Sequence, residues 1–557
     1  MTASPEPPST PDGGPAPSSR PFAAPAPPPG GGQAALGWGL LAVAFIALLF
    51  AYVLPTVRTA AASTSSATFL SAGEFVGGEN YANLLGDRAF TEGFAAAALL
   101  ALGWAVGGGA VAFLVAWCVH LAGRGVRLAA RITAVLAAVA FAPAAWSIAS
   151  QAAHMESWST GGAASQPSWS AWTAIASGTV FGIGLLVGLA AFRGGAETGR
   201  RARTVLAAAG LTALALLAAG LQSFAYGVAT AVQPASPNTH LYRIAFLMAD
   251  SGTAAAASVM LLAPLALLGI GAGLVVALAR VRIDVPLGAS RSGPLQADLR
   301  SGSREPHGFR PGPGVGAIAL LGLFAAGALI NLEPWLSRVA DGPGASSGAV
   351  AAVANTWGSA LVTTAVALAS AFAGAFAIGV VRPLGDRSLW LLLPFSPWLF
   401  VGTGPLVLEH YEALIEAEGH GTFLGMAPRA WIAVPALFLL TALLWGVESR
   451  RREAVASGLS PEAARGAAVR AAWPLAALIG LGVLIANAQD TYWQLVTGTP
   501  DRASAWSAMA APLTQYGADA QVDVGIGYPL WLLVPFAAAA VCAAVWSLPK
   551  AGIRTGR

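Results

Sequence analysis

Charged residues are scarce in this chain, and lysine is almost absent. Asp, Glu, Lys and Arg make up 10% of the 557 residues, whereas a soluble domain has roughly 25%. Lys550 is the only lysine, and Ala551 follows it. The glycine–lysine–serine/threonine ending of a phosphate-binding P-loop is therefore excluded. If ATP drives this protein, another polypeptide must hydrolyse it.

Cysteine and histidine are also rare. Cys118 and Cys542 both fall in apolar runs, which indicates small packing residues rather than a disulfide framework. The six histidines are scattered without the spacing of a metal site. We expect no metal and no cofactor bound by this chain.

Apolar residues dominate what is present. Hydrophobic residues make up 56% of the sequence, which is typical of a membrane protein. The net charge is +4, but the arginines are concentrated between apolar runs. This distribution indicates membrane orientation rather than nucleic-acid binding.

The apolar runs are long enough for about twelve membrane-spanning helices, which need about 20 residues each. Residues 1–33 are rich in proline, glycine and alanine and are predicted to be a disordered tail. The predicted spans lie near 34–57, 94–120, 128–150, 169–192, 204–222, 253–279, 314–335, 355–381, 389–408, 429–447, 472–488 and 528–548.

The connecting segments agree on one orientation. With the N-terminus inside, every predicted inner loop carries arginine, as the positive-inside rule requires. The hydrophilic stretch 281–313 is predicted to be a cytoplasmic linker, and 549–557 a cytoplasmic tail. We therefore expect an all-α polytopic protein with both termini cytoplasmic. Two six-helix halves, 34–280 and 314–548, would form a parallel repeat about the membrane normal.

One charged segment, Glu453 to Pro474, lies between two predicted spans on the basic side. Gly458 and Pro461 should interrupt a helix there, and Ser460 should cap the next helix, which Pro461 and Glu462 open. The sequence predicts a short helix, a turn and a second helix that enters the membrane.

This segment resembles the EAA loop of ABC importer permeases, the loop that docks into the ATPase subunit. The matching positions are Glu453, Ala454, Gly458 and Pro474. Val455 stands where the family has a second alanine, and the distance from Gly458 to Pro474 exceeds the family norm. A plain alanine-rich cytoplasmic loop is the alternative.

Four further segments resemble the carbohydrate branch of that family, related to the two membrane subunits of the maltose transporter. They are Phe75–Phe90, Leu221–Val259, Asn355–Ala377 and Asn487–Gly517. First-subunit features precede the linker and second-subunit features follow it, so the chain resembles two permease subunits fused in tandem.

The first half departs from the family at its coupling loop. Between Phe192 and Val205 it has one acidic residue, Glu197, with Arg200 and Arg201 beside it. This loop either docks weakly on an ATPase through these residues, or is a basic loop that only fixes topology.

Polar and aromatic residues near the span ends are candidates for a translocation path. No predicted span has an evident central charge, which argues against a proton-coupled carrier. Hydrogen bonding between helices and interfacial anchoring are the alternative roles. The candidates are Gln222, Asn487, Gln489, Asp490, Trp398 and Trp493.

The resemblance implies the membrane subunit of an ABC importer in a bacterial plasma membrane. Its partners would be cytoplasmic ATPase subunits, which use ATP, an external solute-binding protein, membrane lipid and a small solute, most simply a carbohydrate. The alternatives are a fused ABC permease for iron, thiamine or a polyamine, a secondary transporter of the major facilitator type, and a degenerate permease that does not transport.

Overall fold

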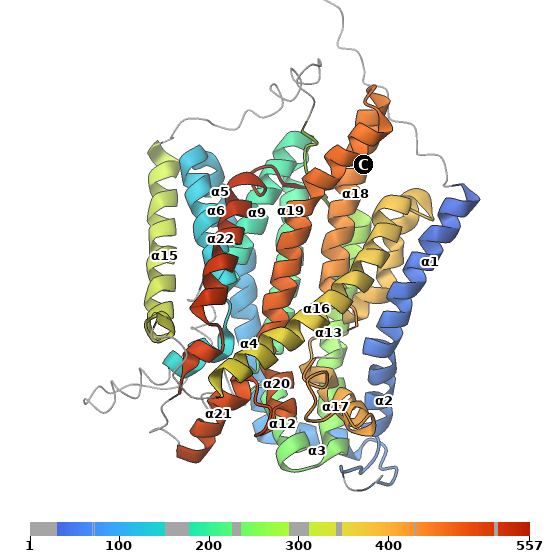
Figure 1. The fold of residues 1–557 in the computed structure, drawn as a ribbon, viewed down its shortest axis with the longest axis vertical. Helices are drawn as coiled ribbons and strands as arrows, with labels where there is room; N and C mark the ends of the chain where they lie inside the picture. The colour runs from blue at the N-terminus through green and yellow to red at the C-terminus, as the bar shows by residue number, and fades with distance from the viewer. Residues whose placement is uncertain are drawn as a thin grey trace, which may run out of the picture.

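A computed structural model describes residues 30–556, except 70, 72, 151–177, 226–234, 289–310, 341–347, 428–430 and 517–521. Most of the predicted tail 1–33 and of the predicted linker 281–313 lies outside the described residues. The described part forms a single bundle of helices, most of which run roughly parallel to one another (Figure 1). We call residues 31–284 the first half and residues 311–554 the second half.

The first half begins with one long helix, formed by α1 (Gly31–Leu48), the π-helical η1 (Leu49–Val53) and α2 (Leu54–Ala62). The other first-half elements are α3 (Glu79–Gly86), α4 (Arg88–Val106), η2 (Gly107–Val111), α5 (Ala112–Ala122), α6 (Arg124–Val139), α9 (Thr179–Thr198), α10 (Arg201–Leu221), α12 (Pro237–Tyr242), η3 (Arg243–Leu247), α13 (Ser251–Ala279) and strand β1 (Arg282–Asp284).

The second half is also mainly helical. Its elements are α15 (Pro311–Ala340), α16 (Ala349–Phe376), η4 (Ala377–Val381), η5 (Gly385–Trp398), η6 (Gly404–Leu406), α17 (Val407–Glu416), α18 (Val434–Ala456), α19 (Pro461–Ala488), α20 (Thr491–Thr497), α21 (Ala505–Tyr516), η8 (Val524–Ile526), α22 (Leu530–Trp546) and strand β2 (Gly552–Arg554).

Each half packs its first and last helices against the other half. α1 packs on α16 and η4, whereas α15 packs on α5 and α6. The last helix of each half also packs on the other half: α13 packs on η5, and α22 packs on α6. Figure 1 shows α15 and α1 at opposite edges of the bundle. The contacts between the halves thus occur in matched pairs.

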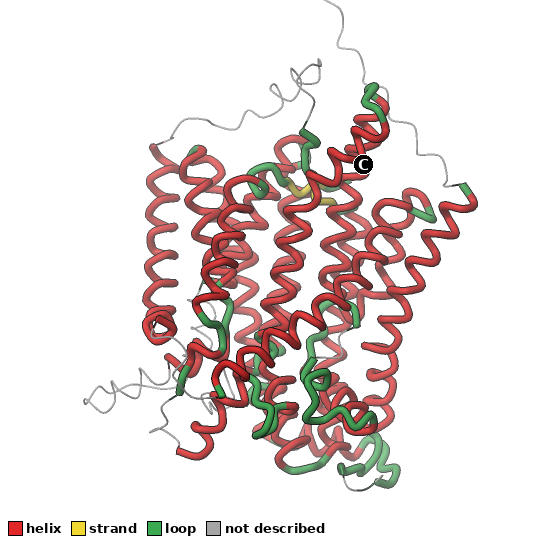
Figure 2. The backbone as a smooth tube through the Cα atoms, in the orientation of Figure 1, coloured by secondary structure: helices red, strands yellow, loops and turns green. Residues whose placement is uncertain are grey.

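The strands that end the halves pair with each other. β1 and β2 are antiparallel, with Ile283 opposite Ile553, and they lie near one end of the bundle (Figure 2). β1 packs on α18 of the second half and β2 on α9 of the first. A Cβ atom added at Gly194 or at Gly446 would lie 2.0 Å from the carbonyl oxygen of Ile553 or Ile283, respectively. Glycine is therefore required where each strand crosses a helix.

Fewer helices meet the length and hydropathy of a membrane span than the sequence predicts. Among the described residues, eight helices do so, and a ninth does if the pair Arg124–Val139 and Pro143–Ser150, bent by 84°, is counted as one. The apolar helix α22 is shorter, and α18 carries the charged residues Glu448 and Arg450 to Glu453 in its last turns. The figure of about twelve spans is not confirmed, but long apolar helices do fit a multi-pass membrane protein.

The predicted span 389–408 is not an α-helix. η5 is a 3-10 segment, and Gly402 and Thr403 then follow in an irregular link to η6. Pro394 and Pro397 lie inside η5, and proline lacks the N–H that an α-helix needs. Neighbouring α13 packs against this segment.

The basic loops meet at one end of the bundle. Arg554 contacts Glu197 and Asp284, Arg450 contacts Asp284, and Arg452 donates to the Val380 carbonyl (3.3 Å). A Cβ at Gly37, near the start of α1, would touch the Val381 side chain at 2.9 Å. The start of α1 and strand β2 therefore lie at this same end, which we call the basic end.

Candidate functional site

A cavity of about 360 Å³ lies between the two halves, at the level where α10 and α19 end. Gln222 and Gln489 cap the C-termini of these two helices, and both line the cavity. α10 spans Arg201–Leu221, so the cavity lies roughly 30 Å from the basic end at 1.5 Å per residue. Two predicted path residues thus occupy matching positions in the two halves.

The Gln222 side chain connects the first half to the irregular link of the second half, around Gly402, by hydrogen bonds. Its amide nitrogen donates to the Phe400 carbonyl (2.7 Å), and its amide oxygen accepts from the Gly402 N–H (2.7 Å). The Gln222 carbonyl accepts from the Asn238 side chain (2.8 Å). The Asn238 side-chain oxygen is buried and has no hydrogen-bond partner among the described residues, which is uncommon for a buried polar atom.

Asp490 supplies the acidic group of the cavity wall. It begins α20, accepting from the Trp493 N–H (3.3 Å), and its other oxygen accepts from the Thr403 hydroxyl. Burial raises the pKa of the Asp490 carboxyl above its ordinary value, and the bonds from Thr403 and Trp493 oppose that rise. The carboxyl can still accept hydrogen bonds from a solute.

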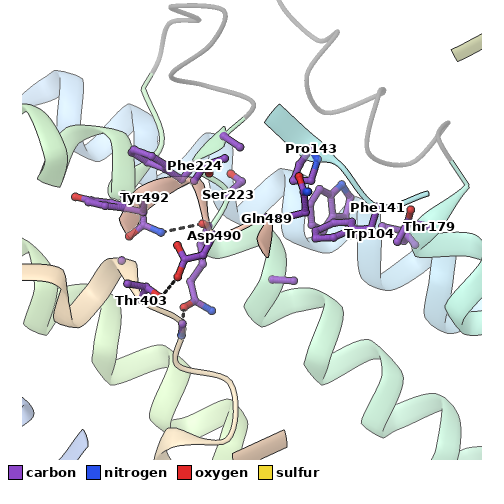
Figure 3. A pocket seen from close by; sticks show the side chains of 18 of the residues that line it. Trp104, Phe141, Pro143, Thr179, Ser223, Phe224, Thr403, Gln489, Asp490 and Tyr492 are labelled. Carbon is purple, nitrogen blue, oxygen red and sulfur yellow. Dashed lines mark hydrogen bonds between the residues drawn. The ribbon is translucent and has the colours of Figure 1, made fainter. Parts of the chain in front are cut away.

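Aromatic rings flank these polar groups on two sides. Phe224 and Tyr492 stack with ring centroids 4.1 Å apart. Figure 3 shows them on one side of Asp490, with Phe141 and Trp104 on the other side of Gln489. Aromatic faces beside hydrogen-bonding groups are suited to a solute that has both C–H surface and polar atoms.

The other predicted path residues lie off this cavity. Asn487 lines a neighbouring cavity of about 580 Å³ and donates to the Thr364 hydroxyl (2.9 Å). Trp398 donates to the Thr56 hydroxyl (3.0 Å), and Trp493 is fully buried in an apolar cluster. Asn238 and Thr403 were missed by the sequence analysis. The glycine-rich break around Thr403 was the available signal, because backbone breaks at membrane depth line cavities.

The segment Glu453–Pro474 forms the projecting end of a helical hairpin. The predicted short first helix is wrong: α18 runs unbroken from Val434 to Ala456. Gly458 then adopts φ +98°, and the Leu459 N–H donates to the Ala454 carbonyl (3.0 Å), which is the Schellman ending that glycine favours. Ser460 caps α19 by accepting from the Ala463 N–H (3.3 Å), as the sequence predicts.

The tip of this hairpin is exposed. The Glu453 side chain is 59% exposed and pairs with Arg450 (3.0 Å), and Glu462 lies exposed in the first turn of α19. Figure 1 shows the α18–α19 hairpin projecting past the neighbouring helix ends. The tip is therefore available to a partner at the basic end.

The matching hairpin of the first half is short. Gly458 follows Gly446 by twelve residues, but Gly199 follows Gly194 by only five. α18 extends ten residues beyond Gly446 and α9 four beyond Gly194, a difference of about 9 Å at 1.5 Å per residue.

The acidic residue of the short hairpin is already paired. Glu197 pairs with Arg193 (3.4 Å) and with Arg554 of the C-terminal strand. Arg200 and Arg201 are exposed where α10 begins. The two hairpins thus present different surfaces at the basic end.

Comparison of the chain with protein-family models, with curated proteins and with solved structures gives no match.

Proposed function

We propose that this chain is the fused permease subunit of an ATP-binding-cassette importer. The single observation that carries the proposal is the exposed hairpin around Glu453 and Gly458, at the basic end of a bundle with matched halves. Nucleotide hydrolysis in a separate ATPase would move this hairpin. The interlocked halves would then rock about the cavity as rigid bodies.

The asymmetry of the two hairpins favours one-sided coupling. The second half offers a protruding tip with Glu453 exposed, whereas Glu197 of the first half is held by Arg554. We infer that the second half carries most of the ATPase contact. The basic end would face the cytoplasm, in keeping with the positive-inside rule.

The cavity supports a carbohydrate as the solute. Gln222, Asn238 and Gln489 make the cavity wall polar without adding charge, and Phe224 and Tyr492 contribute stacked rings. A sugar presents hydroxyl groups at its rim and C–H groups on its faces, so both kinds of wall residue would be used. An external binding protein would deliver the sugar to the end of the bundle opposite the basic end.

A second candidate solute is a polyamine. Asp490 lines the cavity, and a buried carboxylate favours a cation because the opposite charge offsets the cost of burial. In this case the protein would still be an ATP-driven permease.

The test is co-purification. Tagged full-length chain is purified from native membranes, and ATP hydrolysis by the eluate is measured together with the proteins present. We expect an ATPase subunit to co-purify with the wild-type chain. Its yield should fall about tenfold or more in Glu453→Ala and Gly458→Asp, because a few residues carry most of an interface's binding energy.

Arg88→Gln is the matched control. Arg88 is an exposed residue in an ion pair with Glu92, at the start of α4 and away from the hairpin, and its variant should retain the ATPase. Equal ATPase yield from all four proteins, or the absence of an ATPase from the wild type, would contradict the proposal.

A further inference from the structure

A chain of ion pairs crosses between the halves at the basic end. Glu197 pairs with Arg554, Arg554 lies 2.9 Å from Asp284, and Asp284 pairs with Arg450 (2.6 Å). Arg450 also pairs with Glu453 (3.0 Å). The β1–β2 pair and these charges together form one structure, which we call the strap.

The strap joins parts of the chain that are far apart in sequence. β1 follows the last helix of the first half, yet it lies on α18 of the second half. β2 follows the last helix of the second half, yet it lies on α9 of the first half. The Thr204 and Thr555 hydroxyls share a hydrogen bond (2.9 Å), and the Gly556 N–H donates to the Ala279 carbonyl (2.8 Å). Each half is thereby tied to the other twice.

The charge at the centre of the strap is buried. Asp284 is 6% exposed, and both of its carboxyl oxygens accept from Arg450: Oδ1 from Nε (2.9 Å) and Oδ2 from Nη2 (2.6 Å). Arg282 is a third arginine at this point, and burial lowers the pKa of its guanidinium, while Asp284 opposes that change. Moving α9 away from α18 would part Arg554 from Asp284 and break the β1–β2 pairing, and parting a buried ion pair is costly.

The position of the strap gives it a mechanical consequence. The polar cavity lies roughly 30 Å away along α10, at the other end of the interface between the halves. The strap connects α9 and α18, so a path from the cavity to the basic end that passes between these helices can open only if they move apart. Both helices are covered by the strap, so it must part or slide first.

We propose that the strap is an intramolecular lock that keeps the basic end closed, and that its opening precedes release of solute to that side. The lock itself is independent of the identity of the solute. The release of solute and the uptake measurement below rest on the proposed function, whereas the closed lock and the labelling experiment do not.

The first experiment tests the strand pairing. Cys118 and Cys542 are replaced by alanine, Ile283→Cys and Ile553→Cys are introduced together, and a protease site is inserted within 289–310. Directly opposed residues of antiparallel strands have Cα atoms about 4.5–5.5 Å apart, which is within the range of Cα separations that a disulfide spans. Oxidation should join the two protease fragments through this engineered strand disulfide. The control pair Ile283→Cys with Lys550→Cys, which is out of register, should stay separate, and equal cross-linking of both pairs would overturn the strap.

The second experiment measures opening without transport. Ala219→Cys on the cavity wall is labelled with a membrane-impermeant maleimide from the basic side, in vesicles whose sidedness is fixed by labelling of Glu462→Cys. Asp284→Asn should speed the labelling by about tenfold, since it removes one partner of a buried charge pair. The engineered strand disulfide should abolish labelling until it is reduced. Arg465→Gln, an exposed change at the same end, should have no effect.

Unchanged labelling in Asp284→Asn and in the disulfide-linked protein would overturn the lock. Uptake separates this result from failure of the proposed function. If the strap is a lock, the oxidised, disulfide-linked protein should not take up solute, and reduction should restore ATP-dependent uptake. Uptake by the disulfide-linked protein would overturn the lock. If the unlinked protein moves no solute, the proposed function fails, while the labelling still decides the lock.

Discussion

Individual charged residues matter here because the chain has so few of them. Several buried charges among the described residues are held by specific partners. Glu448 is paired with Arg451 and Arg452 (2.7 Å each), and the Arg382 guanidinium lies 3.7 Å from the centroid of the Trp445 ring. Such pairs are kept because an unpaired buried charge is strongly destabilising. Asp490 and Glu409 are buried acids of a different kind, because neither is held by an ion pair with arginine among the described residues. Each of them gives a prediction.

Asp490 discriminates between the two candidate solutes. Asp490→Asn keeps the shape of the cavity wall and removes its charge. We expect a neutral sugar to bind within a few-fold of wild type, whereas a polyamine should lose on the order of tenfold or more in affinity, because one charge-assisted hydrogen bond is worth about 1.5–3 kcal/mol. Equilibrium binding to the purified chain measures both. Equal losses for the two ligands would contradict a charge-reading role for Asp490.

Glu409 gives a pH dependence of stability. Burial, with the neighbouring carboxylates Glu412 and Glu416 adding to it and Arg58 opposing it, raises the pKa of Glu409 to about 7. The folded protein thus holds a proton that the unfolded chain releases near pH 4.5. The stabilisation is full below pH 4.5 and disappears as the pH rises through 7.

Glu409→Gln should therefore remove this dependence. We expect the variant to be more stable than wild type at pH 8 by about 1–3 kcal/mol, since one pKa unit corresponds to about 1.4 kcal/mol. At pH 5 the two proteins should be nearly equal. Thermal unfolding in detergent at both pH values measures this, and a gain that is the same at pH 5 and pH 8 would show that charge is not its cause.

At the scale of elements, local signals predicted the hairpin better than they predicted the spans. Gly458 and Ser460 act within a few residues of their own positions, so the turn and the cap could be read from sequence. The continuity of α18 could not, because the exchanged strand β1 packs along it. The segment η5 was predicted to be a membrane-spanning α-helix because its apolar run is long enough. That criterion takes no account of Pro394 and Pro397, which an α-helix does not accommodate well.

The crossing of β1 over α18 makes a glycine testable. Gly446→Ala would place a Cβ 2.0 Å from the Ile283 carbonyl oxygen, and overpacking of this kind costs about 1–3 kcal/mol. Gly466 in α19 has no neighbouring atom within 4 Å of such a Cβ. Gly466→Ala should therefore be neutral or stabilising by about 0.5–1 kcal/mol, the ordinary helix preference.

Denaturant unfolding of the two glycine variants in detergent compares them directly. Gly446→Ala should also slow formation of the engineered strand disulfide, because the strand is displaced. Equal stability of the two variants would mean that β1 does not lie on α18 as described.

At the scale of the whole molecule, composition and arginine placement predicted a helical membrane protein. Composition and arginine placement could not predict that α1 and α15 each pack against the opposite half, or that Glu197 pairs with Arg554. These contacts join distant parts of the chain. The cavity was found only in part. Gln222, Gln489 and Asp490 stand at helix ends that sequence reveals, whereas Asn238 and Thr403 reach the cavity through irregular backbone.

This architecture suggests how force would reach the cavity. α19 begins at Pro461, beside the exposed tip, and ends at Ala488, one residue before Gln489 on the cavity wall. A push on the tip would thus act on one continuous helix that reaches the cavity. The strap would oppose that movement until its charges part.

Photocrosslinking from the hairpin tip tests the central claim most directly. A photoreactive amino acid replaces Glu462 in the full-length chain, native membranes are irradiated, and the adduct is identified by mass spectrometry. The account predicts an adduct with a polypeptide that carries a P-loop and hydrolyses ATP, and no such adduct when the same residue replaces Arg88. An adduct that contains no ATPase, or the same ATPase captured equally from both positions, would contradict it.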